Sequence, residues 1–171
     1  MLGPTDDIAD IRETLGWMAK VSHSGLAIWG GAIVDSFLAD LIAANMPNLS
    51  NRMRTKLFEG YGPLGSFAAK IDLAYCMGHI PSELRRRLQA IRDIRNEFAH
   101  STKLLNFESD TILAMMKKFP DYKSERPHLF FLDKVNECTV ELGQLTDQAH
   151  RVMILRRRTM AKPDSSSEKS E

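Results

Sequence analysis

Three side chains that could act together on a phosphate ester lie within six positions of one segment, LQAIRDIRNEFAHS at residues 88–101. They are Arg95, Asn96 and His100. A histidine titrates near neutral pH and can shuttle a proton, and an arginine can hold a phosphate through its fork of donors. With RNA, the 2′-hydroxyl supplies an internal nucleophile. Proton transfer by His100 and charge stabilisation by Arg95 could then suffice for cleavage without a metal.

The same residues also have a purely structural interpretation. A cationic side chain near a helix C-terminus interacts favourably with the partial negative charge there, which is where His100 lies. Arg92 and Arg95 could be solvated or paired with Asp93 and Glu97 on the helix surface. The sequence favours this interpretation, and the catalytic one stays open beside it.

Helix geometry decides what a catalytic site would require. On a straight helix, Arg95 and His100 lie roughly 140° apart and about 7.5 Å apart along the axis, so they do not share one face. Long side chains lean towards the helix N-terminus, which takes the Arg95 guanidinium away from His100. Either the helix ends before His100, or a second copy completes the site. We therefore predict a homodimer with the helix of residues 81–100 at or beside its two-fold axis.

The same helix carries further basic residues that could contact phosphate. Arg92, Asn96 and His100 follow one another at spacings of four and line a stripe beside the apolar one. The run Arg85–Arg87 lies earlier on this helix. Arg87 and Arg92 are therefore candidate phosphate-binding residues, and the alternative is an ordinary solvated face.

The elements that must position these side chains are helices. Apolar residues recur at helical spacing, as in Leu84, Leu88, Ile91, Ile94 and Phe98, and strand signals are almost lacking. The chain length fits one domain. We predict an all-α, single-domain bundle of about six to seven helices over residues 1–158, followed by a Ser-rich, disordered tail over 159–171. The expected helices are residues 5–18, 24–45, 51–60, 66–78, 81–100, 108–119 and 127–158.

Charge limits the nucleic-acid functions that this chain can have. Its 171 residues include 23 Lys and Arg against 22 Asp and Glu, a formal net charge of +1. A specific DNA binder normally presents a basic face and a recognition helix, and neither stands out here. Direct sequence-specific DNA binding is therefore not expected.

Cysteine and histidine spacing gives little sign of a metal site. Cys76 and His79 are three residues apart, but no second ligand pair accompanies them, so we expect no metal and no cofactor. Cys76 and Cys138 are expected to be buried thiols rather than a disulfide. Trp17 and Trp29 are expected in the core rather than on a base-stacking surface.

The chain shows no sign of export or membrane insertion. Its N-terminal segment is acidic and lacks the apolar core of a signal sequence, so we expect a cytoplasmic protein. The most apolar segment, residues 25–46, is interrupted by Asp35, Asp40 and the Gly30–Gly31 pair. It is expected to be the central buried helix, with its glycines at a close helix contact, rather than a membrane span.

Two resemblances to known families add to this reading. The string RNEFAH at residues 95–100 resembles the R-x-x-x-x-H motif of the HEPN superfamily of all-helical domains. The string EGYGPLGSFAAKIDLAYCMGHI at residues 59–80, followed by Pro81 and an Arg-rich helix, resembles the mannitol operon repressor family. This second resemblance extends over residues 24–155 and also implies a helical fold.

The two resemblances imply different functions. The mannitol operon repressor family is associated with negative control of sugar operons and has no recognisable DNA-binding element, which implies action through a protein partner such as a transcription factor. Many HEPN domains are metal-independent ribonucleases with a composite site across a homodimer, which would contain Arg95, Asn96 and His100 and take RNA. We favour the regulatory interaction module, with the ribonuclease as the alternative and a purely structural partner-binding bundle as a third reading.

Overall fold

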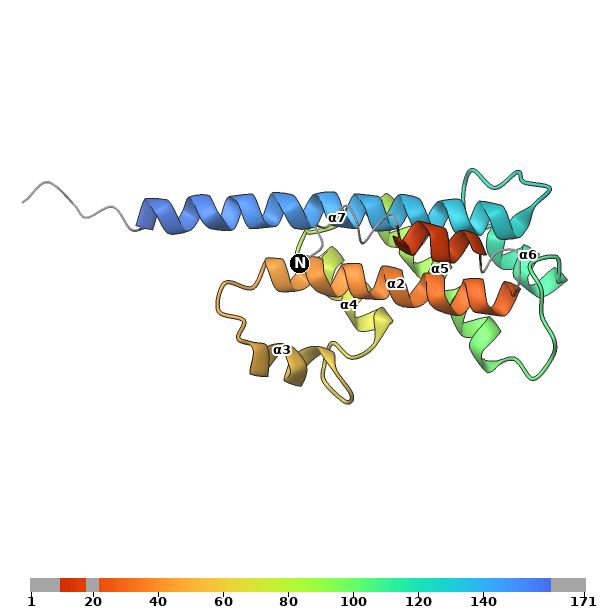
Figure 1. Ribbon diagram of the computed structural model, residues 1–171, viewed down its shortest axis with the longest axis horizontal. Helices are drawn as coiled ribbons and strands as arrows, with labels where there is room; N and C mark the ends of the chain where they lie inside the picture. Colours follow the sequence, from red (N-terminus) through yellow and green to blue (C-terminus); the bar gives the residue numbers. More distant parts are fainter. Residues whose placement is uncertain (1–9, 18–21, 161–171) are drawn as a thin grey trace, which may run out of the picture.

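A computed structural model of the protein describes residues 10–17 and 22–160, and every regular element in them is a helix (Figure 1). This confirms the predicted all-α fold. A helix over residues 10–17 comes first. The others are α2 (His23–Ala44), α3 (Asn51–Phe58), α4 (Phe67–Cys76), α5 (Ser82–His100), α6 (Asp110–Met116) and α7 (Pro127–Met160).

Capping residues explain several helix boundaries. The hydroxyls of Ser22, Ser50 and Ser66 each accept a hydrogen bond from the backbone N–H three residues further on, at 3.0, 3.3 and 3.2 Å. Beyond the end of α4, Gly78 has a φ of 72°, a left-handed conformation that suits glycine. Pro81 then precedes α5. The boundaries predicted at Ser50, Gly78 and Pro81 are confirmed.

Helix α5 packs against four other helices, which are α2, α4, α6 and α7. The predicted apolar stripe of this helix is buried: Leu84, Leu88, Ile91, Ile94 and Phe98. Because α5 is held on several sides, its polar residues occupy defined positions relative to the neighbouring helices.

Helices α2 and α7 run side by side, and glycine allows their close contact (Figure 1). A Cβ atom added at Gly30 would lie 3.0 Å from Cγ2 of Val135 and 3.3 Å from Cε1 of Phe131, both on α7. The close approach predicted at the Gly30–Gly31 pair is therefore confirmed.

Helix α2 is also the most apolar element. By length and composition it could cross a membrane, with a mean hydropathy of 1.6 over its best 18-residue window, but 50% of that window is buried inside the bundle. Asp35, which interrupts the apolar run, forms an ion pair with the buried Lys70 of α4 at 2.7 Å. The packing of α2 agrees with the predicted central buried helix.

Helix α7 extends well past the other helices at its C-terminal end (Figure 1). Its 34 residues give it a length of about 51 Å. The helix continues to Met160, two residues past its predicted end at Arg158. The remainder of the predicted tail, residues 161–171, lies outside the described residues.

Three burial predictions were wrong. Cys76, the last residue of α4, is exposed, whereas Cys138 is buried as expected. Trp17 and Trp29 are 62% and 52% exposed. The buried stripe of α2 runs through residues such as Ala27, and Trp29 lies on the opposite side of the helix. Size and hydrophobicity suggested burial for Trp29, but its place on the helix determined exposure.

Both ends of α6 differ from the expected range of residues 108–119. Helix α6 covers only Asp110–Met116, because a turn precedes it in which the hydroxyl of Ser109 accepts from the backbone N–H of Asn106 at 3.0 Å. The predicted helix over residues 5–18 agrees with the described helix of residues 10–17. Its other residues, 5–9 and 18, lie outside the described part of the chain.

Candidate functional site

Arg95 packs against α2 rather than pointing directly into solvent. It lies on the apolar side of α5, and its aliphatic stem covers Gly31 of α2. A Cβ atom added at Gly31 would be 2.9 Å from Cβ and 2.7 Å from Cγ of Arg95. The stem of Arg95 therefore occupies the space that a larger residue at position 31 would need.

The head of Arg95 is engaged with its sequence neighbour. Its Nη1 donates a hydrogen bond of 2.9 Å to Oδ1 of Asn96. The structure thus brings two of the three candidate catalytic residues, Arg95 and Asn96, into contact. The contact orients the guanidinium along the surface of α5.

His100 is the last residue of α5 and is exposed. The helix is continuous through this residue, so the histidine does not turn back towards Arg95. The continuous helix that the predicted divergence of the two side chains requires is therefore present. A site that used both would need a group from elsewhere, and the composite site at a dimer interface stays a prediction.

Arg92 takes part in an ion-pair network with Asp93 and Lys118. Its Nη2 lies 2.7 Å from Oδ1 of Asp93, and Nζ of Lys118 lies 2.8 Å from Oδ2 of the same carboxylate. Burial alone would raise the pKa of Asp93, but the hydrogen bonds from Lys118 and Arg92 outweigh it and hold the pKa below its ordinary value. A phosphate bound by Arg92 would compete with this carboxylate.

Arg87 links α5 to α7 through two carboxylates. Its Nη2 lies 2.5 Å from Glu141 and its Nη1 lies 3.9 Å from Glu137, and only 15% of the side chain is exposed. Arg85 pairs with Asp72, and Arg86 pairs with Glu83. These pairings agree with the structural interpretation of the basic run. The phosphate-binding roles of Arg87 and Arg92 stay predictions.

A groove of about 770 Å³ lies elsewhere, between the C-terminal part of α2, the start of α3 and the outer part of α7. It combines apolar and charged side chains. The apolar ones include Phe37, Met46, Leu49, Val140, Met153 and Ile154, and the charged or titratable ones include Asp40, Arg54, Asp147 and His150. Sequence reasoning did not identify this groove, because its walls come from segments about 100 residues apart.

The α7 wall of the groove has a regular pattern. Val140, Asp147 and Ile154 follow one another at seven-residue spacing, which places them on one face over about 21 Å. Val140 and Ile154 are 44% and 52% exposed. An apolar stripe with a central acid on a projecting helix is suited to contact with another protein.

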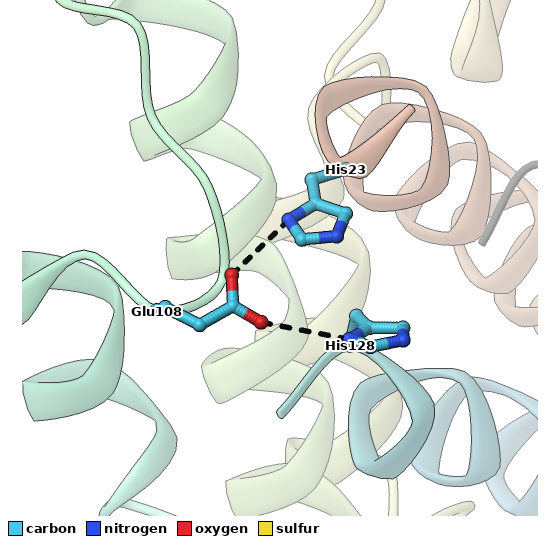
Figure 2. A group of neighbouring side chains, drawn as sticks. All are labelled: His23, Glu108 and His128. Atoms are coloured by element: carbon cyan, nitrogen blue, oxygen red, sulfur yellow. Dashed lines mark ion pairs between the residues drawn. The ribbon is translucent and has the colours of Figure 1, made fainter. Parts of the chain in front are cut away.

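A second polar cluster also went unnoticed in the sequence. His23, Glu108 and His128 converge at the start of α2 and α7 (Figure 2). Sequence spacing indicates only Cys76 and His79 as a possible ligand pair, and the pKa of His79 is lowered by burial. No spacing rule joins residues from three separate segments, so only the fold could reveal this cluster.

No protein-family model and no curated protein sequence matches the chain. Among solved structures, the chain is similar to a chain in the X-ray structure of the MtlR–HPr complex from Escherichia coli, with a TM-score of 0.53 and 15% sequence identity. The match covers 82% of this chain and 99% of the other. At this identity the similarity concerns the fold.

Proposed function

We propose that this protein is a regulatory interaction module that acts by binding a partner protein. The observation that carries this proposal is the similarity of its fold to a chain solved in the MtlR–HPr complex. The resemblance of residues 59–80 to the mannitol operon repressor family points in the same direction. The balanced charge of the chain agrees with a protein partner rather than an operator sequence.

The groove beside α7 is the surface best suited to this partner. Its apolar side chains supply area to bury, and the charged ones at Asp40, Arg54 and Asp147 supply orientation. The outer part of α7 projects past the bundle, so a partner could approach it without displacing another helix (Figure 1). An HPr protein is the first candidate, because the similar structure is a complex with HPr.

Two matched variants of α7 test the surface. Ile154 belongs to the groove, whereas Val152 lies two residues away on the opposite side of the helix, and they are 52% and 49% exposed. Isothermal titration of the full chain with HPr from its own source organism should give saturable binding. Ile154→Asp should weaken this binding and Val152→Asp should leave it unchanged. Equal effects of the two variants would reject the groove, and no binding of HPr would reject this partner.

The metal-independent ribonuclease remains the second candidate. The observation in its favour is that His100 is exposed at the end of α5, next to the exposed Ala99, where a second copy could meet it. A homodimer would supply the missing half of the site. A cysteine introduced at position 99 should then crosslink across the two-fold axis. A monomer at micromolar concentration by light scattering would remove both the dimer and the composite site.

A further inference from the structure

We propose that His23, Glu108 and His128 form a binding site for one divalent transition-metal ion of the zinc class. The three residues come from the first turn of α2, the turn before α6 and the first turn of α7. Figure 2 shows Glu108 beside the two imidazoles, with one carboxylate oxygen directed at each. Two histidines and one carboxylate are an established ligand set for zinc with an open fourth position.

The distances between the ligand atoms fit such an ion. Nδ1 of His23 lies 3.5 Å from Oε2 of Glu108, and Nδ1 of His128 lies 3.7 Å from Oε1 of the same residue. Bonds of about 2.0–2.2 Å to a tetrahedral zinc ion place two ligand atoms about 3.3–3.5 Å apart. One ligand atom from each residue lies within 4.8 Å of the others. Small side-chain rotations would therefore complete the coordination.

The nitrogen of His23 that lies nearest to Glu108 is a hydrogen-bond acceptor. Nδ1 of His23 accepts a hydrogen bond of 3.1 Å from the backbone N–H of Phe107, so this nitrogen presents its lone pair. The carboxylate of Glu108 faces this same nitrogen. The Phe107 N–H satisfies only the nitrogen, whereas a cation between the two groups would bind the nitrogen and the carboxylate together. Metal binding would exchange the Phe107 hydrogen bond for a coordinate bond.

His128 supplies a buried nitrogen, Nδ1, that lacks a hydrogen-bond partner among the described residues. The 3.7 Å separation from Glu108 is too long for a hydrogen bond. A buried polar atom without a partner is costly, and a metal bond would satisfy it.

Packing holds the two imidazoles ready for coordination. Their rings stack with centroids 5.0 Å apart and an interplanar angle of 19°, and the His23 ring also meets the edge of Phe107. Both side chains are about three-quarters buried, at 27% and 23% exposure, whereas Glu108 is 52% exposed and leaves a path for the ion. A bound ion would tie together the starts of α2 and α7 and the turn before α6.

Equilibrium dialysis of the untagged full chain against ZnCl₂, after removal of metal with EDTA, tests the proposal. The wild type should retain one zinc ion per chain and melt at a higher temperature when zinc is present. His128→Gln and Glu108→Gln should each weaken zinc binding by at least about tenfold, because one of three protein ligands is lost. Glu108→Gln is the variant least able to disturb folding, since this side chain is half exposed.

Matched controls come from histidines outside the cluster. His79→Gln and His150→Gln should bind zinc as the wild type does, because His79 lies between α4 and α5 and His150 lies about 33 Å along α7 from His128. Circular dichroism would establish that each variant is folded. The proposal is overturned if the wild type retains no zinc, if the cluster variants retain it as the controls do, or if His79→Gln or His150→Gln loses it equally.

Discussion

Replacement of Gly31 by alanine should destabilise the protein, although the same change usually stabilises a helix. The new Cβ would lie 2.7 Å from Cγ of Arg95, roughly 0.8 Å inside the shortest favourable carbon–carbon separation of about 3.5 Å. Helix propensity contributes about 1 kcal/mol in favour of alanine, whereas overpacking costs about 1–3 kcal/mol. The free energy of unfolding should therefore fall by about 1 kcal/mol, which lowers Tm by about 2–4 °C.

Gly143→Ala provides the matched control on α7. A Cβ atom there would meet only Cε1 of Phe37, at an ordinary 3.9 Å, so the helix-propensity gain should raise the free energy of unfolding by up to about 1 kcal/mol. Urea denaturation of both variants measures the difference. Arg95→Ala in the Gly31→Ala background removes Cγ and should recover part of the loss. If Gly31→Ala stabilises as much as Gly143→Ala, the close packing of Arg95 on α2 is wrong.

The remaining predictions concern charge, thiols and catalysis. Asp93→Asn should lower the free energy of unfolding at neutral pH. The folded-state pKa of Asp93 lies below its ordinary 3.8, so the difference from wild type should vanish as the pH falls through that pKa. Unfolding measured as a function of pH tests this. A thiol reagent should label Cys76 rapidly and spare Cys138, whose pKa burial raises to about 12; two fast thiols per folded chain would contradict this. If the protein is a ribonuclease, it should cleave single-stranded RNA in the presence of EDTA, and a folded His100→Ala variant should cleave it about 10²–10⁴-fold more slowly. A wild type that does not cleave RNA, or a variant that cleaves it as fast as wild type, removes this candidate.

The sequence was sufficient for the local features of the fold. The apolar spacing along α5, the serine at position 50 and the glycine at position 78 each act within a few residues, so their effects can be read without knowledge of the tertiary structure. The repeated apolar positions of α5 also placed this helix correctly against the core.

Tertiary contacts explain what the sequence did not reveal. Trp29 is exposed because the stripe that α2 buries is set by its neighbours α5 and α7, and the type of a single residue does not fix that stripe. His23, Glu108 and His128 are far apart in the sequence and meet only where the two long helices begin. The motif from Arg95 to His100 was recognisable as a pattern, but the contact of Arg95 with Gly31 depends on how α2 crosses α5.

Backbone amide hydrogen exchange, with and without HPr bound, tests the partner-binding account most directly. We predict protection of α7 between Val140 and Ile154 and of the segment that joins α2 to α3, because these residues line the groove. The C-terminal end of α5 around His100 should exchange equally in both states. Protection confined to the end of α5, or no change at α7 while HPr is bound, would contradict the account.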